Sequence, residues 1–341
     1  MKKIIGLVCV LSVLIGSMAF AAGGRAAAEA GGHAFVFKST GNPFGERVWD
    51  GFREAVESQG YQAIFRAPAL PTVEGQIQII EQLIAQRVAS IGVSSNDFDA
   101  LQPVLARARN QGIQVFSVDS AVNAASRNVH INQADTHLIA LSLVEATYDL
   151  LGGSGEFAIL SATSTAANQN AWIAAMQEIM TAQPRFANLN LVRVAFGDDL
   201  RDRSTSETQA LLASFPNLRV IVAPTTVGIA AAARVITDQG LIGQIYVTGL
   251  GLPSEMLAYI ENGATPYMYL WNPIDMGYLG GHAAIAMTRG QMTGAIGNTF
   301  AAGRLGGPFN VISAPDGGTE VILGPPFRFD PSNIRFWAEV Y

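Results

Sequence analysis

Apolar runs typical of buried β-strands alternate with amphipathic helical segments from residue 33 to about residue 290. In the segment 43–59, for example, Phe44, Val48, Phe52 and Val56 recur every four residues and would lie on one face of a helix. Strands separated by such helices pair in parallel, with helices on both faces of the sheet. The units are too numerous for one sheet of ordinary size. The sequence therefore predicts an α/β fold with two doubly wound parallel-sheet lobes.

The predicted elements have clear bounds over most of this region. Strands are expected at residues 34–37, 61–65, 88–93, 113–118, 157–160, 189–195, 220–222, 245–248 and 266–270. Helices are expected at residues 43–59, 73–86, 101–110, 136–151, 168–182, 203–214, 227–239, 254–261 and 274–289. Glycine and proline residues after about residue 300 interrupt this alternation and mark loops around short strands such as 320–323.

The N-terminus has the pattern of a secretory signal peptide. Lys2 and Lys3 precede an apolar stretch at residues 4–15, and Ala19-Phe-Ala21 has the small-x-small form of a cleavage site. The apolar stretch is too short to span a membrane. We therefore predict a signal peptide at residues 1–21, followed by a flexible Ala- and Gly-rich leader at residues 22–32.

Composition and motifs argue against several classes of protein. The 27 acidic and 21 basic residues give a net charge of −6, which leaves no basic surplus for nucleic acid. The only cysteine, Cys9, lies in the predicted signal peptide, so the exported chain has no thiol. Phosphate-binding glycine motifs and a G-x-S-x-G nucleophile motif are absent, and the four histidines lack metal-ligand spacing. We predict no catalytic residues, no metal and no cofactor.

Polar and aromatic residues directly follow the predicted strands, where open α/β sheets bind their ligands. The segment 160–172 is typical, because small hydroxyl residues lead into Asn168, Gln169 and Asn170, and Trp172 adds a flat apolar face. Taken alone, such a segment more often provides helix capping and turns. Amides, hydroxyls and aromatic rings together suit a neutral sugar. The candidate ligand-binding residues are Lys38, Asn42, Phe44, Asp119, Asn168, Gln169, Pro224, Thr225, Thr226, Leu250, Trp271 and Asn272.

Two charged candidates stand at strand ends. Lys38 is the only lysine after the predicted signal peptide, in a chain that otherwise uses arginine, which indicates a need for a compact ammonium group. Asp119 could pair with Lys38 or accept hydrogen bonds from ligand hydroxyls; alternatively, it is a helix cap or a turn residue. A further acidic cluster, Asp198, Asp199 and Asp202, is interpreted as the solvated start of a helix.

The sequence resembles the type I periplasmic sugar-binding proteins of ABC importers, and within them the rhamnose-binding group. The resemblance extends from about residue 35 to the C-terminus. It depends on several motifs: Gly75-Gln, Asp119-Ser, Ile131-Asn-Gln, Ile159-Leu-Ser-Ala-Thr, Asn168-Gln-Asn-Ala-Trp, Pro224-Thr-Thr-Val-Gly-Ile-Ala-Ala-Ala-Ala, Val247-Thr-Gly-Leu-Gly, Leu270-Trp-Asn-Pro and Ala302-Gly-Arg-Leu-Gly.

Receptors for the furanone autoinducer-2 are close relatives of this group. The resemblance implies that their ligand-binding positions correspond to Lys38, Asp119, Asn168-Gln169 and Pro224-Thr-Thr226. Asn168 stands where those receptors have aspartate, and Thr226 stands where they have alanine. Both departures favour the rhamnose group over autoinducer-2.

The resemblance also implies the architecture and mode of action. Two lobes joined by a hinge of three crossings would close around L-rhamnose without making or breaking a bond. They would then present the sugar to an ABC permease in the inner membrane. The protein would be a periplasmic monomer, with an N-terminal lobe at 33–131 plus about 272–300 and a C-terminal lobe at 132–271 plus about 301–341. The alternatives are an autoinducer-2 receptor, an exported sugar-processing enzyme, and a repressor of the same lobe architecture. The enzyme would need a nucleophile or paired carboxylates, and the repressor would need a DNA-binding helix pair at the N-terminus.

Overall fold

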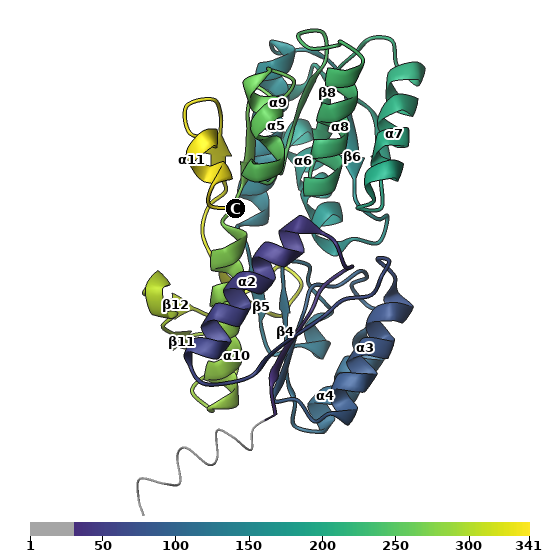
Figure 1. Ribbon diagram of the computed structural model, residues 1–341. Helices are drawn as coiled ribbons and strands as arrows, with labels where there is room; N and C mark the ends of the chain where they lie inside the picture. Colours follow the sequence, from purple (N-terminus) through teal and green to yellow (C-terminus); the bar gives the residue numbers. More distant parts are fainter. Residues whose placement is uncertain (1–30) are drawn as a thin grey trace, which may run out of the picture.

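The computed structural model describes residues 31–341, which form two α/β lobes placed end to end (Figure 1). The predicted signal peptide (1–21) and nearly all of the predicted leader (22–32) lie outside the described residues. Parallel sheets with helices on both faces confirm the predicted α/β fold class. No helix within residues 31–341 is long and apolar enough to span a membrane.

The first lobe contains a sheet with the strand order β13-β14-β5-β4-β3-β1-β2. All neighbouring strands are parallel except β13 and β14, which are antiparallel. Helices α2 (Pro43–Ser58) and α10 (Pro273–Thr288) cover one face, and α3 (Val73–Ala85) and α4 (Gln102–Asn110) cover the other (Figure 1). The strands are β1 (His33–Val36), β2 (Ala63–Arg66), β3 (Ser90–Val93), β4 (Gln114–Val118), β5 (His130–Asn132), β13 (Ile312–Ser313) and β14 (Thr319–Ile322).

The second lobe contains a parallel sheet with the order β7-β6-β8-β9, extended by β10 and its antiparallel partner β15. Its strands are β6 (Gly155–Ser161), β7 (Leu189–Phe196), β8 (Leu218–Ala223), β9 (Tyr246–Gly249), β10 (Met268–Leu270) and β15 (Phe327–Phe329). Its helices are α5 (Thr136–Leu151), α6 (Ala167–Ala182), α7 (Arg201–Ser214), α8 (Thr226–Asp238), α9 (Pro253–Glu261) and α11 (Ile334–Ala338). A small hairpin of β11 (Thr299–Phe300) and β12 (Phe309–Asn310) follows α10 in the chain.

The chain passes between the lobes at three places, after β5, after β10 and after β14. The sequence led us to expect all of residues 301–341 in the second lobe, and this is wrong for β13 and β14. Strand β14 pairs with β5 of the first sheet through the register Val321–Ile131. Only β15 and α11 return to the second lobe, where they contact β10 and α9.

Helices α2 and α10 approach each other more closely than ordinary side chains would allow. A Cβ atom on Gly51 would lie 1.8 Å from the carbonyl oxygen of Ile274, and one on Gly277 would lie 1.8 Å from that of Val48. Glycine is required at both positions because backbone atoms occupy the space of a side chain. This contact fixes α10, which enters the first lobe after the second crossing, against a helix from the start of the chain.

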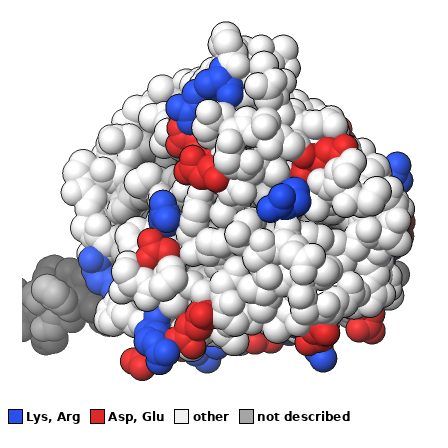
Figure 2. Space-filling model, turned by 90° about the horizontal axis from the view of Figure 1, so that it is seen from above, with Lys and Arg blue, Asp and Glu red and all other residues white. Residues whose placement is uncertain are grey.

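The surface at the end of the second lobe carries scattered charges of both signs between wide uncharged areas (Figure 2). Several of the arginines of this lobe are paired, such as Arg185 with Glu145 at 3.0 Å and Arg201 with Glu255 at 2.8 Å. Exposed pairs of this kind contribute about 0–1 kcal/mol each to stability.

Candidate functional site

A small cavity of about 30 Å³ lies where the carboxyl ends of the strands of the two lobes face each other. The first lobe provides residues that follow β1 and β4, and the second lobe provides residues that follow β6, β7, β8, β9 and β10. The side chains that enclose it are mostly buried. They are Phe37, Lys38, Asn42, Phe44, Asp119, Gln169, Trp172, Asp199, Pro224, Thr225, Thr226, Leu250, Leu270 and Trp271.

Buried amides fix the backbone that presents Lys38. The Asn96 side chain donates a hydrogen bond of 2.9 Å to the carbonyl oxygen of Lys38. Gln76, which is fully buried on α3, donates to the carbonyl oxygens of Phe37 at 3.2 Å and Ser94 at 2.8 Å. These bonds join the ends of β1 and β3 with α3. The Lys38 ammonium is therefore directed into the cavity by a rigid backbone, although only 5% of the residue is exposed.

Asp119 is held in place by its own backbone and by polar neighbours. Its φ of 69° lies in the left-handed region, which aspartate tolerates better than most residues. The Ser94 hydroxyl donates to Oδ2 at 2.7 Å, and the Lys38 Nζ lies 3.8 Å from the same oxygen. Burial raises the pKa of the Asp119 carboxyl, and the nearby Lys38 ammonium and the Ser94 hydrogen bond oppose this rise.

Asn168, at the start of α6, connects the second lobe to the first. Its Nδ2 donates to Asp119 Oδ1 at 3.0 Å, and its Oδ1 lies 3.3 Å from both Lys38 Nζ and Ser120 Oγ, which donate to it. A second contact between the lobes is the hydrogen bond of 2.9 Å from the Thr165 hydroxyl to the carbonyl oxygen of Asn96. The two lobes therefore touch directly around the cavity, in a closed arrangement.

Two buried polar atoms of the cavity lining have no partner among the described residues. They are Oε1 of Gln169, which can only accept a hydrogen bond, and Nε1 of Trp271, which can only donate one. Leaving a buried polar atom unpaired costs about 1–3 kcal/mol. A ligand hydroxyl can both donate and accept, so a polyhydroxylated molecule could pair with both atoms.

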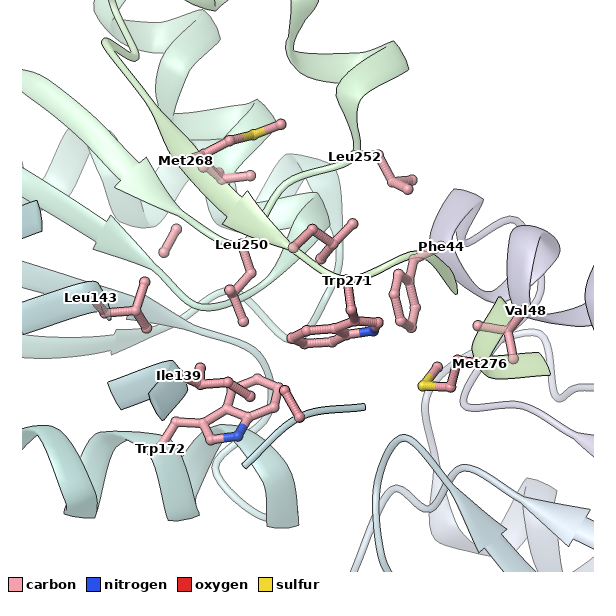
Figure 3. Packing of buried hydrophobic residues seen from close by; sticks show 14 of the residues in the cluster. Phe44, Val48, Ile139, Leu143, Trp172, Leu250, Leu252, Met268, Trp271 and Met276 are labelled. Carbon is pink, nitrogen blue, oxygen red and sulfur yellow. The ribbon is translucent and has the colours of Figure 1, made fainter. Parts of the chain in front are cut away.

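Aromatic rings from both lobes meet at Trp271, in the segment of the second crossing. Figure 3 shows Trp271 between Phe44 of α2 and Trp172 of α6. The Phe44 and Trp271 ring centroids are 6.1 Å apart at an interplanar angle of 88°, and those of Trp172 and Trp271 are 5.8 Å apart. Leu250 also lies in this buried cluster. The cavity lining thus contains apolar and aromatic side chains in addition to charged and amide groups.

Two of the predicted candidates are not part of the cavity lining. Asn168 lies behind the cavity and contacts its charged residues, as described above. The Asn272 side chain caps α10 by accepting hydrogen bonds from the backbone amides of Ile274 at 2.9 Å and Asp275 at 3.2 Å. Asn272 therefore has the typical role of asparagine at a helix start and lies outside the cavity lining.

Four residues of the lining were absent from the predicted ligand-binding residues: Phe37, Trp172, Asp199 and Leu270. Trp172 was noted in the segment 160–172 as an apolar face but was not included among them. Phe37 and Leu270 belong to strand ends and were interpreted only as core residues. Asp199 was assigned to a solvated helix start, although it lies in the loop that follows β7, three residues beyond the strand. Its position in a loop after a strand was the signal that could have identified it.

Two histidines of the described chain, His33 and His130, are held by hydrogen bonds inside the first lobe. His33 bonds with Ser90 at 2.8 Å, and His130 bonds with Ser117 at 2.9 Å, in the interior of the first sheet. Burial lowers the pKa of His33 to about 4, with a contribution from Arg289, and lowers the pKa of His130 to about 3, with a contribution from Arg127. Residues 31–341 contain no group of three or more His, Cys, Asp or Glu side chains that could hold a metal ion.

Two parallel-sheet lobes that close on a polar and aromatic cavity define a two-lobed binding protein for a small ligand. The comparison with known sequences gives the family. The chain belongs to the periplasmic binding protein domain family, whose model matches residues 33–292.

Solved structures share this fold over most of the chain. An ABC transporter solute-binding protein from Clostridium phytofermentas with bound L-rhamnose is 47% identical, with a TM-score of 0.90 over 92% of this chain and 99% of that chain. A sugar ABC transporter protein from Actinomyces odontolyticus is 34% identical, with a TM-score of 0.71 over 90% of this chain and 97% of that one. LsrB from Clostridium saccharobutylicum, in complex with AI-2, is 20% identical, with a TM-score of 0.84 over 89% and 98% of the two chains. At this identity, the likeness to LsrB concerns the fold alone.

Proposed function

We propose that this protein is the solute-binding protein of an ABC sugar importer and that its ligand is L-rhamnose. The observation that carries the proposal is the closed cavity between the lobes, in which Gln169 Oε1 and Trp271 Nε1 lack partners within residues 31–341. A sugar hydroxyl supplies the missing donor or acceptor at each atom. The 47% identity to a solute-binding protein with bound L-rhamnose supports the choice of sugar.

The lining suits a 6-deoxy sugar in both its polar and apolar parts. Asp119 and Gln169 would accept hydrogen bonds from hydroxyls, and the Lys38 ammonium would donate to a hydroxyl or the ring oxygen. Phe44 and Leu250 would surround the methyl group, and Trp271 would cover an apolar face of the ring. Asn168 would act from behind the cavity by orienting Lys38 and Asp119.

Binding and delivery would proceed without chemistry on the sugar. The lobes would close around the ligand, and the closed surface would be recognised by an ABC permease in the inner membrane. We propose that the protein works as a periplasmic monomer, exported by the signal peptide at residues 1–21 and cleaved there. It would act as a binding protein and not as an enzyme.

Isothermal titration calorimetry of the purified protein, freed of carried-over ligand, tests this proposal. We expect one-to-one binding of L-rhamnose, and much weaker or no heat with ribose, galactose and autoinducer-2. The variant Gln169→Ala should lose at least tenfold in affinity, since it removes a buried acceptor. Asn170→Ala is the matched control, because Asn170 is exposed and its side chain bonds to the Ser164 carbonyl. Absence of heat with L-rhamnose would refute the choice of ligand.

The alternative, an autoinducer-2 receptor, gives a different result in the same titration. It would bind the furanone and ignore L-rhamnose. Asn168 and Thr226, where those receptors are expected to have aspartate and alanine, argue against it. Thr226 lines the cavity, so its additional bulk lies where the ligand would be.

A further inference from the structure

The second lobe presents a carboxylate to the cavity that has no assigned role. Asp199 follows β7 in the loop before α7 and lines the cavity together with Asp119 of the first lobe. Its φ is 54°, and that of the preceding Asp198 is 55°, so both residues have left-handed backbones. The loop thereby directs two neighbouring carboxylates in different directions.

The partners of these two carboxylates differ. Asp198 forms an ion pair with Arg203 of α7 and is absent from the cavity lining. Asp199 has no ion-pair partner among residues 31–341; its Oδ1 accepts a hydrogen bond from the hydroxyl of Thr225, which is 4% exposed. Thr225 thereby orients the carboxylate, while Oδ2 is available to a ligand. A carboxylate oxygen without a charged partner is a strong acceptor for a hydroxyl.

The two lobes contribute different charges to the cavity lining. Lys38, Asp119 and Asp199 are the charged residues in it, and Lys38 is adjacent to Asp119. The first lobe therefore carries a compensated pair and the second an uncompensated acceptor. Gln169 Oε1, also from the second lobe, is a further acceptor that has no partner in the described part of the chain. A ligand that pairs with these two acceptors of the second lobe must donate hydrogen bonds to them from its hydroxyls.

We propose that Asp199 is a ligand-binding residue that accepts a hydroxyl hydrogen of the sugar from the second lobe, opposite Asp119. This inference rests on the proposed function, because it names a further contact in the same site. The sugar would be held by one carboxylate from each lobe. The Asp199 contact would favour neutral ligands rich in hydroxyl donors.

Calorimetry on a matched pair of variants tests this contact. Asp199→Asn removes the charge, and Asp198→Asn makes the same change one residue earlier, on an equally left-handed backbone that asparagine tolerates. We expect Asp199→Asn to weaken L-rhamnose binding at least tenfold and Asp198→Asn to change it less than threefold. Asp199→Gly, which suits a φ of 54°, provides a second variant if Asp199→Asn does not fold.

Monodeoxy analogues of L-rhamnose separate direct contact from an indirect effect. If Asp199 accepts from one hydroxyl, the analogue that lacks this hydroxyl should bind the unmodified protein and Asp199→Asn with equal affinity, while other analogues still lose tenfold. An equal loss for all analogues, or equal L-rhamnose binding by both aspartate variants, would overturn the inference. If the unmodified protein binds none of the sugars tested, the proposed function fails, and this inference fails with it.

Discussion

Asn168 is the residue whose replacement gives the clearest electrostatic prediction. Its Nδ2 lies 3.0 Å from Asp119 Oδ1, so Asn168→Asp would place two carboxyl groups at hydrogen-bonding distance. Two such groups share one proton, which raises the pKa of one of them. The shared proton is kept at low pH and lost as the pH rises, after which the two charges repel each other across the lobes. We expect sugar affinity in Asn168→Asp to fall about tenfold between pH 5 and pH 8, measured by calorimetry. The exposed Asn170→Asp should show no such trend, and a flat profile for Asn168→Asp would contradict the geometry.

Asn168 and Thr226 together bear on ligand choice. We predict that the double variant Asn168→Asp, Thr226→Ala moves specificity from L-rhamnose toward autoinducer-2, because it restores a carboxylate and removes bulk from the lining. Competition of the two ligands in calorimetry measures this shift. An unchanged preference would mean that these positions do not determine specificity.

Single residues also show what sequence reasoning could achieve at the site. The rule that ligands bind after strand ends predicted Lys38, Asp119 and Gln169, which all reach the cavity. The same rule placed Asn272 there, but a helix starts directly after it and uses its side chain as a cap. Asp199 was missed because adjacent aspartates before a helix are usually solvated. The turn that separates Asp199 from Asp198 depends on left-handed dihedral angles, which the sequence alone does not reveal.

At the level of elements, the contact between α2 and α10 predicts a strong effect of one methyl group. Gly277→Ala would put Cβ against the Val48 carbonyl oxygen, whereas Gly280→Ala would meet Val118 Cγ2 at 3.2 Å, where a side chain can adjust. Overpacking typically costs about 1–3 kcal/mol. We expect Gly277→Ala to lower the free energy of unfolding by about this amount and Gly280→Ala to change it less, by urea denaturation. Equal stability of the two variants would show that the helices can separate freely.

The buried histidines of β1 and β5 predict sensitivity to acid. Their pKa values in the folded protein are about 4 for His33 and about 3 for His130, below the ordinary 6.5. A lowered histidine pKa means that the unfolded chain binds more protons, so stability is complete above pH 6.5 and is lost as the pH falls toward these values. Between pH 7 and pH 5, each histidine should lower the free energy of unfolding by about 2 kcal/mol. Urea denaturation at the two pH values measures the loss, and His33→Gln should reduce it. If the free energy of unfolding of His33→Gln depends on pH as in the unmodified protein, the loss arises from other groups.

Elements differed in how well the sequence predicted them. Helices such as α2 and α5 were predicted within a residue or two, because their apolar periodicity is a local property. Strand β5 was missed, since it contains only three residues between polar segments. Strand β14 was predicted but assigned to the wrong lobe. Its pairing with β5 joins residues far apart in the chain, and local patterns carry no information on such pairing.

For the whole molecule, closure is controlled by the few bonds between lobes. The Thr165 hydroxyl bonds to the Asn96 carbonyl oxygen outside the cavity lining, so Thr165→Val should destabilise the closed state without touching the ligand. A hydrogen bond contributes about 1 kcal/mol net, so its loss corresponds to about a fivefold loss of affinity. Calorimetry measures the affinity, and small-angle X-ray scattering with and without L-rhamnose measures closure as a smaller radius of gyration. Thr181→Val, which affects a bond within α6, is the control. An unchanged affinity in Thr165→Val would mean that this bond does not help to hold the lobes closed.

The three crossings also affect the order in which the chain can fold. Neither lobe is a continuous stretch of sequence, and the first sheet is complete only when residues 319–322 have paired with β5. Until then β5 is an edge strand with unpaired backbone groups, open to association with other chains. A chain truncated before residue 319 would therefore contain most of both lobes but complete neither. Such a chain should aggregate where the full chain folds.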